Sequence, residues 1–326
     1  MIIPDKNSYF QMLEKFEIVP FTQTRGWYDL HSLYKPEKII FLVNNTDNPT
    51  IACFAHRKTF LGLSMILIEG EAYKNDRACN LNDVRSFYKH LTESGFPIIE
   101  STSGATYDFE YETALRQAGY LRPVGLFSMP STKIINLQNP VCYNQNWKRN
   151  IRKANENNLY FEVTEKITTK ECEDFLKIYS EMTSRKNLSF GFNSEQLFQL
   201  LSDSTHFQLF FVKSSSHERI ASILIHKDIH RAGLLYAATS QAALETSASF
   251  YMYDKLFEYL TSENFRFFDM EKLIPSDDVV NHVFNFKNGI QGTHIQLNGE
   301  WSWYKNSFYR IAVYFVKKFL VKKREL

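Results

Sequence analysis

Glycine is scarce in this sequence, with 12 residues among 326. A loop that wraps a phosphate in its backbone amides usually relies on closely spaced glycines, because a side chain blocks the approach. The shortage therefore argues against an enzyme built on a glycine-rich nucleotide loop. Cysteine is also rare, and no two cysteines have the spacing of a metal or redox motif. We interpret the four, Cys53, Cys79, Cys142 and Cys172, as reduced thiols of a cytosolic protein.

Long apolar runs are missing as well. No segment approaches the roughly 18 consecutive apolar residues of a membrane-spanning helix. The N-terminal residues MIIPDKNSYFQML contain an early acid and no apolar core, unlike a signal peptide. We therefore expect a cytoplasmic protein. What the chain has in abundance is aromatic residues, at 15% with 28 Phe and 18 Tyr, which favours large apolar strand faces.

The net charge of +2 is unevenly distributed. Residues 305–326 contain seven lysines and arginines against Glu325, so this tail is +6 and the rest of the chain is −4. A mildly acidic body is not the footprint of a general nucleic-acid-binding protein. The distribution leaves room for one localised anionic partner.

Hydrophobic periodicity predicts alternating helices and strands in both halves of the chain. In the first half we expect helices at 6–17, 81–94 and 109–119, and strands at 38–45, 50–58, 63–73, 96–102, 120–130 and 132–137. In the second half we expect helices at 146–158, 169–186, 194–203, 247–265 and 278–286, and strands at 159–165, 207–214, 219–228, 232–240, 265–273 and 292–300.

The two halves have a similar order of elements, which predicts an α+β protein with a duplicated domain. A polar stretch at 138–146 is the expected linker. We therefore predict a first domain at 1–140, a second domain at 141–304 and a C-terminal basic amphipathic helix at 305–326.

Four local motifs lie in the same order as in one known family. They are PFTQTRGWYDL (20–30), NWKRNIRKANENNLYFEV (146–163), LLYAATS (234–240) followed by SFYMYDKLFEYLTSENFRFFD (249–269), and FNFKNGIQGTHIQLNGEW (284–301). Together they resemble the Fem-type (FemABX-like) aminoacyl- and peptidyltransferases, and they are spread over nearly the whole chain.

The resemblance implies two tandem GNAT-like (acyl-CoA N-acyltransferase-like) domains that face each other across a cleft. Members of the family transfer an amino acid from aminoacyl-tRNA to a peptide amine of a peptidoglycan precursor. The resemblance implies no cofactor, neither a metal nor an organic redox group. Because the donor is an activated ester, the amine needs only positioning, deprotonation and stabilisation of the developing oxyanion.

The sequence departs from the family pattern at several positions. Ala237-Ala238 stands where the family has a Gly-Gly pair, Asp269 lacks the glycine that often follows it, and His31 stands at a position that is typically lysine. The helical hairpin of some members is absent. The stretch SQAALETSAS (240–249) also lacks the Q/R-x-x-G-x-G/A loop with which GNAT enzymes hold a CoA pyrophosphate, which argues against acetyl-CoA.

The resemblance also suggests the residues that carry the chemistry. Lys287 is expected to stabilise the oxyanion, although a lysine at a helix end also serves the helix dipole. Tyr236 is expected to orient the amine, or else to lie in the core with its hydroxyl satisfied. The two form the predicted catalytic pair.

The expected substrate contacts are Arg185, Phe286, Trp27 and His31. Arg185 would hold an acceptor phosphate, because a planar guanidinium matches phosphate oxygens, or would simply end its helix. His31 would bind phosphate or carry a proton, or else be a surface histidine without a function. Trp27 would line either the cleft or the core. Lys148, Arg149 and Arg152 share one helix and are candidates for tRNA phosphates, against a merely solvated helix face.

Residues 305–326 place Phe308, Ile311, Ala312, Phe315 and Phe319 on one face of a helix. This face either packs on a domain or makes peripheral contact with an anionic membrane surface at the inner face of the membrane.

Three functions remain open from the sequence. The first is acyl or aminoacyl transfer to an amine of a cell-envelope precursor, with aminoacyl-tRNA as donor. The second is an acyl-CoA-dependent N-acyltransferase that modifies a sugar or a lipid-linked glycan. The third is a non-catalytic tandem module that binds an anionic glycan or nucleotide.

Overall fold

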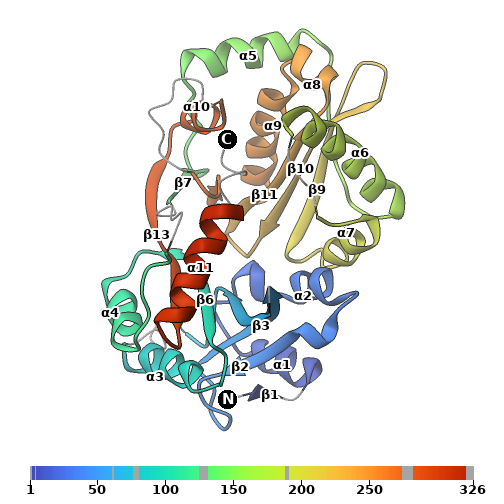
Figure 1. The fold of residues 1–326 in the computed structure, drawn as a ribbon. Helices are drawn as coiled ribbons and strands as arrows, with labels where there is room; N and C mark the ends of the chain where they lie inside the picture. Colours follow the sequence, from blue (N-terminus) through green and yellow to red (C-terminus); the bar gives the residue numbers. More distant parts are fainter. Residues whose placement is uncertain are drawn as a thin grey trace. The chain divides into compact units, whose positions relative to one another are not determined.

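The computed structural model describes residues 2–3, 5–60, 62–75, 81–124, 131–187, 191–273 and 282–320. Its contacts divide the chain into two compact units. Unit 1 comprises Met1–Pro130 with Gln296–Leu326, and unit 2 comprises Ser131–Ile295 (Figure 1).

Unit 1 is built around a sheet with the strand order β1-β2-β3-β4-β6-β13, and β5 pairs with β3. Strands β4 and β6 are parallel, and the other neighbouring pairs are antiparallel. The elements are β1 (Ile2–Ile3), α1 (Lys6–Leu13), η1 (Phe21–Gln23), α2 (Arg25–Ser32), η2 (Pro36–Lys38), β2 (Ile39–Val43), β3 (Ile51–Phe60), β4 (Leu63–Glu69), β5 (Ala72–Tyr73), α3 (Leu81–Thr92), β6 (Ile98–Thr106), α4 (Phe109–Gln117), β13 (Thr293–Tyr304) and α11 (Ser307–Leu320).

Both faces of the unit 1 sheet are covered by helices. Helices α3 and α4 bury Phe87, Tyr88 and Leu115 against one face, together with Trp301 of β13. On the other face the rings of α1 and α2 meet the aromatic residues of β2 and β3, with Tyr9 4.8 Å from Phe41 and Tyr28 5.7 Å from Phe54 between centroids. The high aromatic content of the sequence thus fills both layers.

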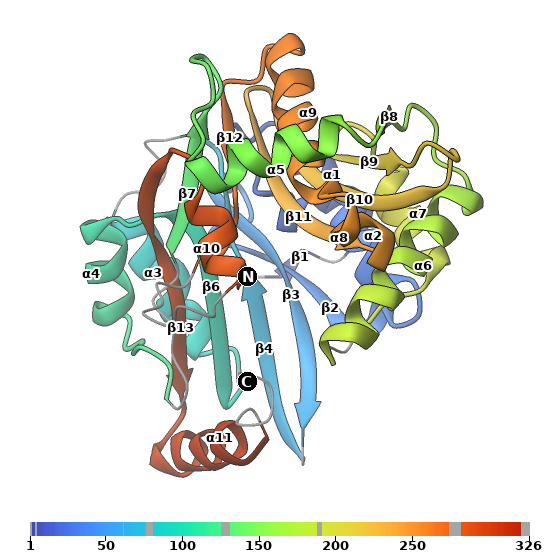
Figure 2. The same ribbon diagram turned by 90° about the horizontal axis from the view of Figure 1, so that it is seen from above.

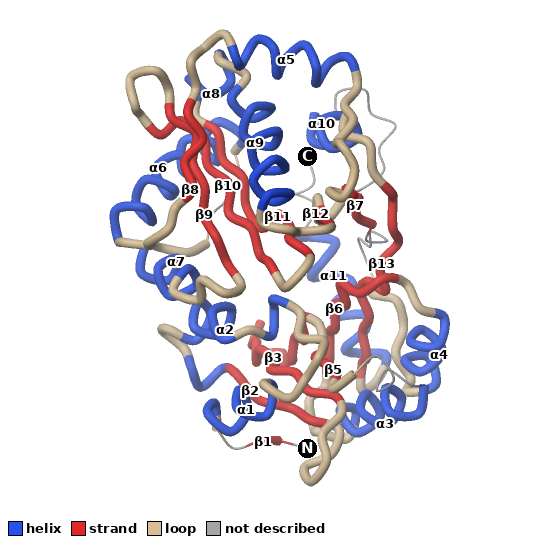
Figure 3. Tube along the Cα trace, turned by 180° about the vertical axis from the view of Figure 1, so that it is seen from behind, coloured by secondary structure: helices blue, strands red, loops and turns tan. Residues whose placement is uncertain are grey.

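Unit 2 has a sheet with the order β7-β12-β11-β10-β9-β8, in which β11 and β12 are parallel. Its elements are β7 (Ser131–Asn136), α5 (Gln145–Asn155), β8 (Tyr160–Val163), α6 (Thr169–Lys186), α7 (Ser194–Leu201), β9 (Phe207–Lys213), β10 (Arg219–Lys227), β11 (Arg231–Thr239), α8 (Gln241–Glu245), α9 (Ala248–Ser262), β12 (Phe267–Asp269) and α10 (His282–Asn288). Helix α9 lies against one face of this sheet and α6 against the other (Figure 3).

Local signals in the sequence account for many of these boundaries. Thr168 and Asn193 begin α6 and α7 with reciprocal capping boxes, which satisfy backbone donors of the first turn. Asn187 ends α6 in the left-handed conformation, with φ +53°, that a helix C-terminus often uses. The main predicted helices and strands are therefore found within a few residues of their expected positions, apart from those in the next paragraph.

Some elements differ from expectation. Helix α2 was not predicted, because its sequence was noted only as part of a motif, and the short α8 was missed. The strand expected at 120–130 is reduced in its described part, residues 120–124, to one bridge between Leu121 and Ser302. Its remainder lies outside the described residues.

The compact units do not follow the division expected at residues 140 and 304. Strand β7 belongs to unit 2 because it pairs with β12, ahead of the polar stretch that was expected to be the linker. Most of β13 belongs to unit 1 because it pairs with β6 from Leu297 to Tyr304. Unit 1 is therefore made from two separate stretches of chain.

Candidate functional site

A fork opens between two parallel strands of unit 2. Strand β12 pairs with only the first three residues of β11, ending at Gly233 and Asp269. Beyond this point β11 continues to Thr239 beside β10 alone among the described strands, and a bulge leaves Leu235 without a partner in the register. We call Leu234–Thr239 and the 270–273 segment after β12 the two arms of the fork. A bulge of this kind re-aims side chains and ends pairing, and it commonly lies next to an active site.

Charged residues form hydrogen bonds where the two arms of the fork begin. The buried carboxylate of Asp269 accepts hydrogen bonds from the Thr132 hydroxyl, from the backbone N–H of Glu271 at 2.8 Å, and from Arg231. Glu271, which has a φ of +57°, in turn lies 2.7 Å from His226 Nε2. These bonds fix the direction in which the chain leaves β12.

Lys287 is attached to the arm that leaves β12. Its ammonium group donates to the carbonyl oxygens of Met270 at 2.6 Å, Lys272 at 2.9 Å and Glu271 at 3.4 Å. The side chain is buried, and this burial lowers the pKa of Lys287, while Glu271 and Asp269 oppose the shift. Lys287 is thus a buried cation at the fork and not a solvated lysine at a helix end.

Tyr236 belongs to the other arm, and Arg185 of α6 contacts it. The half-buried ring of Tyr236 meets Tyr179 of α6 at 5.8 Å and Phe192 at 5.4 Å between centroids. The exposed Arg185 donates from Nη2 to the Thr239 carbonyl at 2.9 Å, at the end of β11. The structure therefore brings three of the predicted residues, Lys287, Tyr236 and Arg185, to the two arms of one fork.

The turn that follows β11 is closed by side chains. The backbone N–H of Gln241 donates to Glu181 Oε1 at 2.6 Å, and that of Ala243 donates to Ser240 Oγ at 3.2 Å. The amides of Gln241 and Ala243 are thus already bonded, the first of them to a carboxylate. The sequence had shown only that glycine is missing here.

Phe286 is partly buried and packs against the core of unit 2, where two of the sequence motifs meet. Its ring lies 4.6 Å from that of Trp147, and its carbonyl accepts from Trp147 Nε1 at 2.9 Å. A Cβ on Gly289 would lie 2.2 Å from the same indole, which explains the glycine. Phe286 therefore sets the position of α10, and with it the neighbouring Lys287.

In unit 1 the predicted residues Trp27 and His31 share one face of α2. Trp27 is buried and donates from Nε1 to Glu69 Oε2 at 3.1 Å. The His31 ring lies 4.9 Å from Trp27 and 5.0 Å from His56 between centroids, and it keeps one side exposed. Burial among these rings and electrostatic repulsion by His56 lower the pKa of His31 to about 4, and burial also lowers the pKa of His56. His31 is therefore neutral near pH 7.

Sequence reasoning did not identify Gln23, which holds this face in place. Gln23 is fully buried, accepts from the Phe54 N–H at 2.7 Å and the Tyr9 hydroxyl at 3.0 Å, and donates to the Gly70 carbonyl at 3.0 Å. Thr24 then caps α2 through the N–H of Trp27. The Phe-Thr-Gln-Thr motif therefore positions Trp27 and His31. The signal available in the sequence was that Gln23 lies within the motif at 20–30 that resembles the family.

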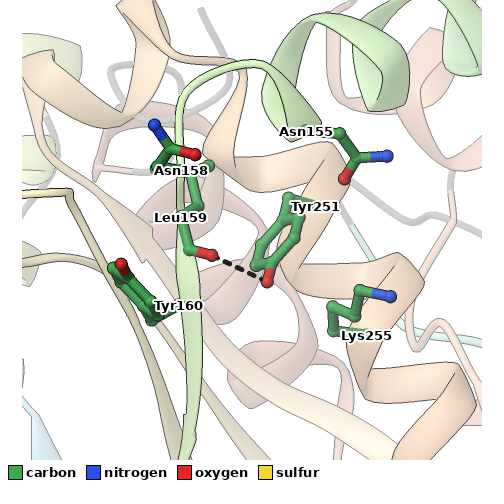
Figure 4. A pocket seen from close by; sticks show the side chains of 6 residues that line it. All are labelled: Asn155, Asn158, Leu159, Tyr160, Tyr251 and Lys255. Carbon is green, nitrogen blue, oxygen red and sulfur yellow. Dashed lines mark hydrogen bonds between the residues drawn. The ribbon is translucent and has the colours of Figure 1, made fainter.

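The predicted phosphate contacts lie on the exposed face of α5. Lys148, Arg149 and Arg152 are exposed, whereas Trp147 and Ala154 face the core. A small pocket of about 280 Å³ lies at the C-terminal end of α5, where Asn155, Tyr160 and Lys255 surround a hydrogen bond from the Tyr251 hydroxyl to the Leu159 carbonyl at 3.0 Å (Figure 4). A larger pocket beside α6, of about 500 Å³, contains Arg219, which is bonded to Glu162, Glu171 and Asp174.

No three His, Cys, Asp or Glu side chains converge as a metal site within the described ranges. In those same ranges, no helix combines the length and apolarity needed to cross a membrane.

The strand order of the two units, with a fork between parallel neighbours, defines a tandem pair of GNAT-like α+β domains. Comparison with solved structures supports this class. A structure of FemX matches with a TM-score of 0.71 at 11% identity, over 95% of this chain and 99% of that chain. L-PGS from Bacillus licheniformis matches with a TM-score of 0.65 at 14% identity, over 96% and 97%. A tandem GNAT protein from the clavulanic acid biosynthesis pathway matches with a TM-score of 0.53 at 10% identity, over 94% and 98%.

No protein-family model and no curated protein sequence matches this chain. The structural matches nevertheless confirm the predicted fold class, two tandem GNAT-like domains of the α+β type, over almost the entire sequence.

Proposed function

We propose that this protein is an acyltransferase that moves an aminoacyl group from an ester donor to an amine of a cell-envelope precursor of the peptidoglycan type. The observation that carries the proposal is the fork in unit 2, together with the buried cation at its edge. A strand edge that no described strand covers can offer backbone groups to an extended acyl chain, as in strand addition by peptides. Lys287 supplies positive charge where the oxyanion would form.

The closed turn after β11 supports an aminoacyl ester over an acyl-CoA donor. A CoA pyrophosphate would need free backbone amides at this turn. The Gln241 amide is instead bonded to the Glu181 carboxylate, whose charge would repel a diphosphate. Aminoacyl-tRNA avoids this requirement, and the exposed cations of α5, Lys148, Arg149 and Arg152, offer contacts to its phosphates.

In the proposed reaction the neutral amine attacks the ester carbonyl, a C–N bond forms and the C–O ester bond breaks. The proton lost by the amine passes to the leaving hydroxyl. Tyr236 orients the amine, and Lys287 donates to the developing oxyanion. The 3.4 Å contact of Lys287 with the Glu271 carbonyl is long for a hydrogen bond, so this N–H is the one that turns to the substrate.

We propose that Arg185 of unit 2 binds a phosphate of the precursor, and that Trp27 and His31 form a separate substrate-binding face on α2 of unit 1. Because His31 is neutral near pH 7, it acts there as a hydrogen-bonding group and not as a cation. Phe286 contributes indirectly, by holding α10 and therefore Lys287 in place.

The test is transfer of a radiolabelled amino acid by the full chain to a UDP-linked muramyl-peptide precursor. We expect product with aminoacyl-tRNA as donor and none with acyl-CoA. Product with acyl-CoA alone would replace the proposal with a CoA-dependent N-acyltransferase. No product with either donor, accompanied by calorimetric binding of the precursor, would indicate a binding module.

Lys287→Met tests the catalytic assignment. We expect kcat to fall about a hundredfold with little change in acceptor affinity, as for the loss of one oxyanion donor. Lys133→Met is the matched control, because Lys133 is also buried and bonds to Asn288 at the end of the same helix. A Lys287→Met protein that is destabilised but retains the kcat of the parent would limit Lys287 to a structural role.

A further inference from the structure

Helix α11 has two apolar faces, and within the described residues one is buried while the other is largely exposed. Val313 is 7% exposed, and Tyr309 and Val316 beside it are half-buried. On the opposite side Phe308 is 67% exposed, Ile311 55% and Phe315 49%. At 100° per residue these three side chains form one stripe, with Tyr314 at its edge. Of the two alternatives left open by the sequence, packing of this face on a domain is wrong for Phe308, Ile311 and Phe315, because the helix packs through Val313 instead.

The exposed stripe belongs to a helix that is fixed in place. Asn306 caps its N-terminus by accepting from the N–H groups of Phe308 at 3.0 Å and Tyr309 at 3.3 Å. Near its other end Lys317 lies 2.8 Å from Glu100 of β6. The helix follows directly from β13, whose residue Ser302 pairs with Glu100 (Figure 2). Unit 1 thus presents the three apolar side chains on a rigid support.

Exposed positive charge lies at the edge of the stripe, at Lys318, and farther round the helix, at Arg310. Arg310 and Lys318 are exposed on α11, and Lys318 lies 5.7 Å from the centre of the Tyr314 ring. The sequence continues with Lys322, Lys323 and Arg324. Large exposed apolar side chains flanked by cations are typical of helices that lie in the plane of a membrane interface. With 14 residues, α11 is about 21 Å long, too short to cross a bilayer.

We propose that α11 docks this protein onto an anionic lipid surface. Phe308, Ile311 and Phe315 insert at the level of the headgroups, while the exposed cations Arg310 and Lys318 bind anionic lipid. The same charges argue against a second copy of the chain as the occupant, because an isologous dimer would bring two tails of +6 together. The proposal does not depend on the reaction that the protein performs.

Co-sedimentation of the full chain with vesicles tests this docking. We expect binding to vesicles of phosphatidylcholine with phosphatidylglycerol, and much weaker binding to phosphatidylcholine alone. Replacing Phe308, Ile311 and Phe315 with serine should lower affinity for the anionic vesicles about a hundredfold. Phe109→Ser is the matched control, since Phe109 is 73% exposed at the start of α4 in the same unit.

Charge is tested separately by Arg310→Gln and Lys318→Gln, each of which should weaken binding to anionic vesicles about fivefold. A Phe315→Trp protein provides an independent readout, with a blue shift of the tryptophan emission expected when anionic vesicles are added. Equal binding to both kinds of vesicle, unchanged binding by the triple serine variant, or absence of binding would overturn the proposal. So would a lipid-free dimer, measured by light scattering, that dissociates in the triple variant.

Discussion

Glu71 in unit 1 and Asp269 in unit 2 are both buried carboxyl groups, but their partners differ. Glu71 lies among hydroxyl groups, with Tyr111 at 3.0 Å and Ser101 and Tyr73 at 3.4 Å. Burial raises the pKa of Glu71 to about 7. Asp269 instead accepts from the Arg231 guanidinium. Unit 1 therefore tolerates a neutral acid in its core, whereas unit 2 keeps an ion pair beside its fork.

The largest expected effect comes from titrating Glu71. Its pKa is raised in the folded state, so its contribution to stability is complete below its ordinary pKa of 4.5 and is lost as the pH rises through about 7. We expect Glu71→Gln to abolish this loss and to gain on the order of 3 kcal/mol at pH 8 relative to pH 4. Urea unfolding at both pH values measures it.

Glu110→Gln, at an exposed position on α4, serves as the control for this titration. Parallel pH profiles for the parent and Glu71→Gln would show that Glu71 is already ionised in the folded protein.

A smaller loss is expected from Asp269→Ala, which breaks the ion pair in unit 2. Removing the carboxylate leaves the N–H of Glu271 without its acceptor and the Thr132 hydroxyl with the Glu271 carbonyl at 3.2 Å, at a cost of about 2 kcal/mol. The partial exposure of Arg231 keeps the effect below that of a fully buried pair. Urea unfolding at pH 7 measures the loss.

Glu258→Ala is the control. It removes an exposed pair with Lys255 and should change stability by less than about 0.5 kcal/mol. Similar values for the two variants would show that the ion pair beside the fork contributes no more to stability than an exposed pair of the same unit.

Arg185→Ala probes the cation that unit 2 offers to an acceptor. We expect the affinity for a UDP-linked precursor to fall roughly tenfold, because a charge-assisted hydrogen bond is lost. Arg185 is exposed and bonds to Thr239, so thermal stability should change little. Isothermal titration calorimetry measures the affinity, with Arg149→Ala on the face of α5 as the control. An unchanged affinity would show that Arg185 does not bind the acceptor.

The smallest effect concerns His31 in unit 1. Its pKa is lowered to about 4, so its contribution to stability is complete above its ordinary pKa of 6.5 and is lost as the pH falls toward 4. This dependence has the opposite sign to that of Glu71. His31→Gln should flatten it slightly in thermal unfolding between pH 5 and 7, measured against His90→Gln on α3. Because His31 is partly exposed, a large effect would contradict the assignment.

The sequence predicted most elements of the fold because their signals are local. The capping box at Thr168 and the apolar periodicity of α6 depend on neighbouring residues alone. The fork could not be predicted, since it arises where β12 stops pairing and a bulge at Leu235 shifts the register. The same holds for the bond between Gln241 and Glu181, whose partners are 60 residues apart.

The candidate site was predicted from resemblance to a family more than from chemistry. The resemblance selected Lys287, and the structure adds that its ammonium group is buried and bonded to three carbonyls. It also selected Phe286, whose neighbours Trp147 and Gly289 show a packing role that the residue type could not reveal. Burial and distant partners depend on the folded chain, and this is why the sequence did not specify them.

The discontinuity of unit 1 has a consequence for its synthesis. The edge of β6 is completed by β13, and the paired residues Thr106 and Leu297 are separated by the whole of unit 2. During translation, residues 1–130 therefore leave the ribosome with an open strand edge, which is a site for aggregation until the last strand arrives. Strands β7 to β12, which form the sheet of unit 2, all precede β13 in the chain, and unit 2 contains only the first three residues of β13. Unit 2 therefore completes its sheet earlier. We expect the middle of the chain to fold before its beginning.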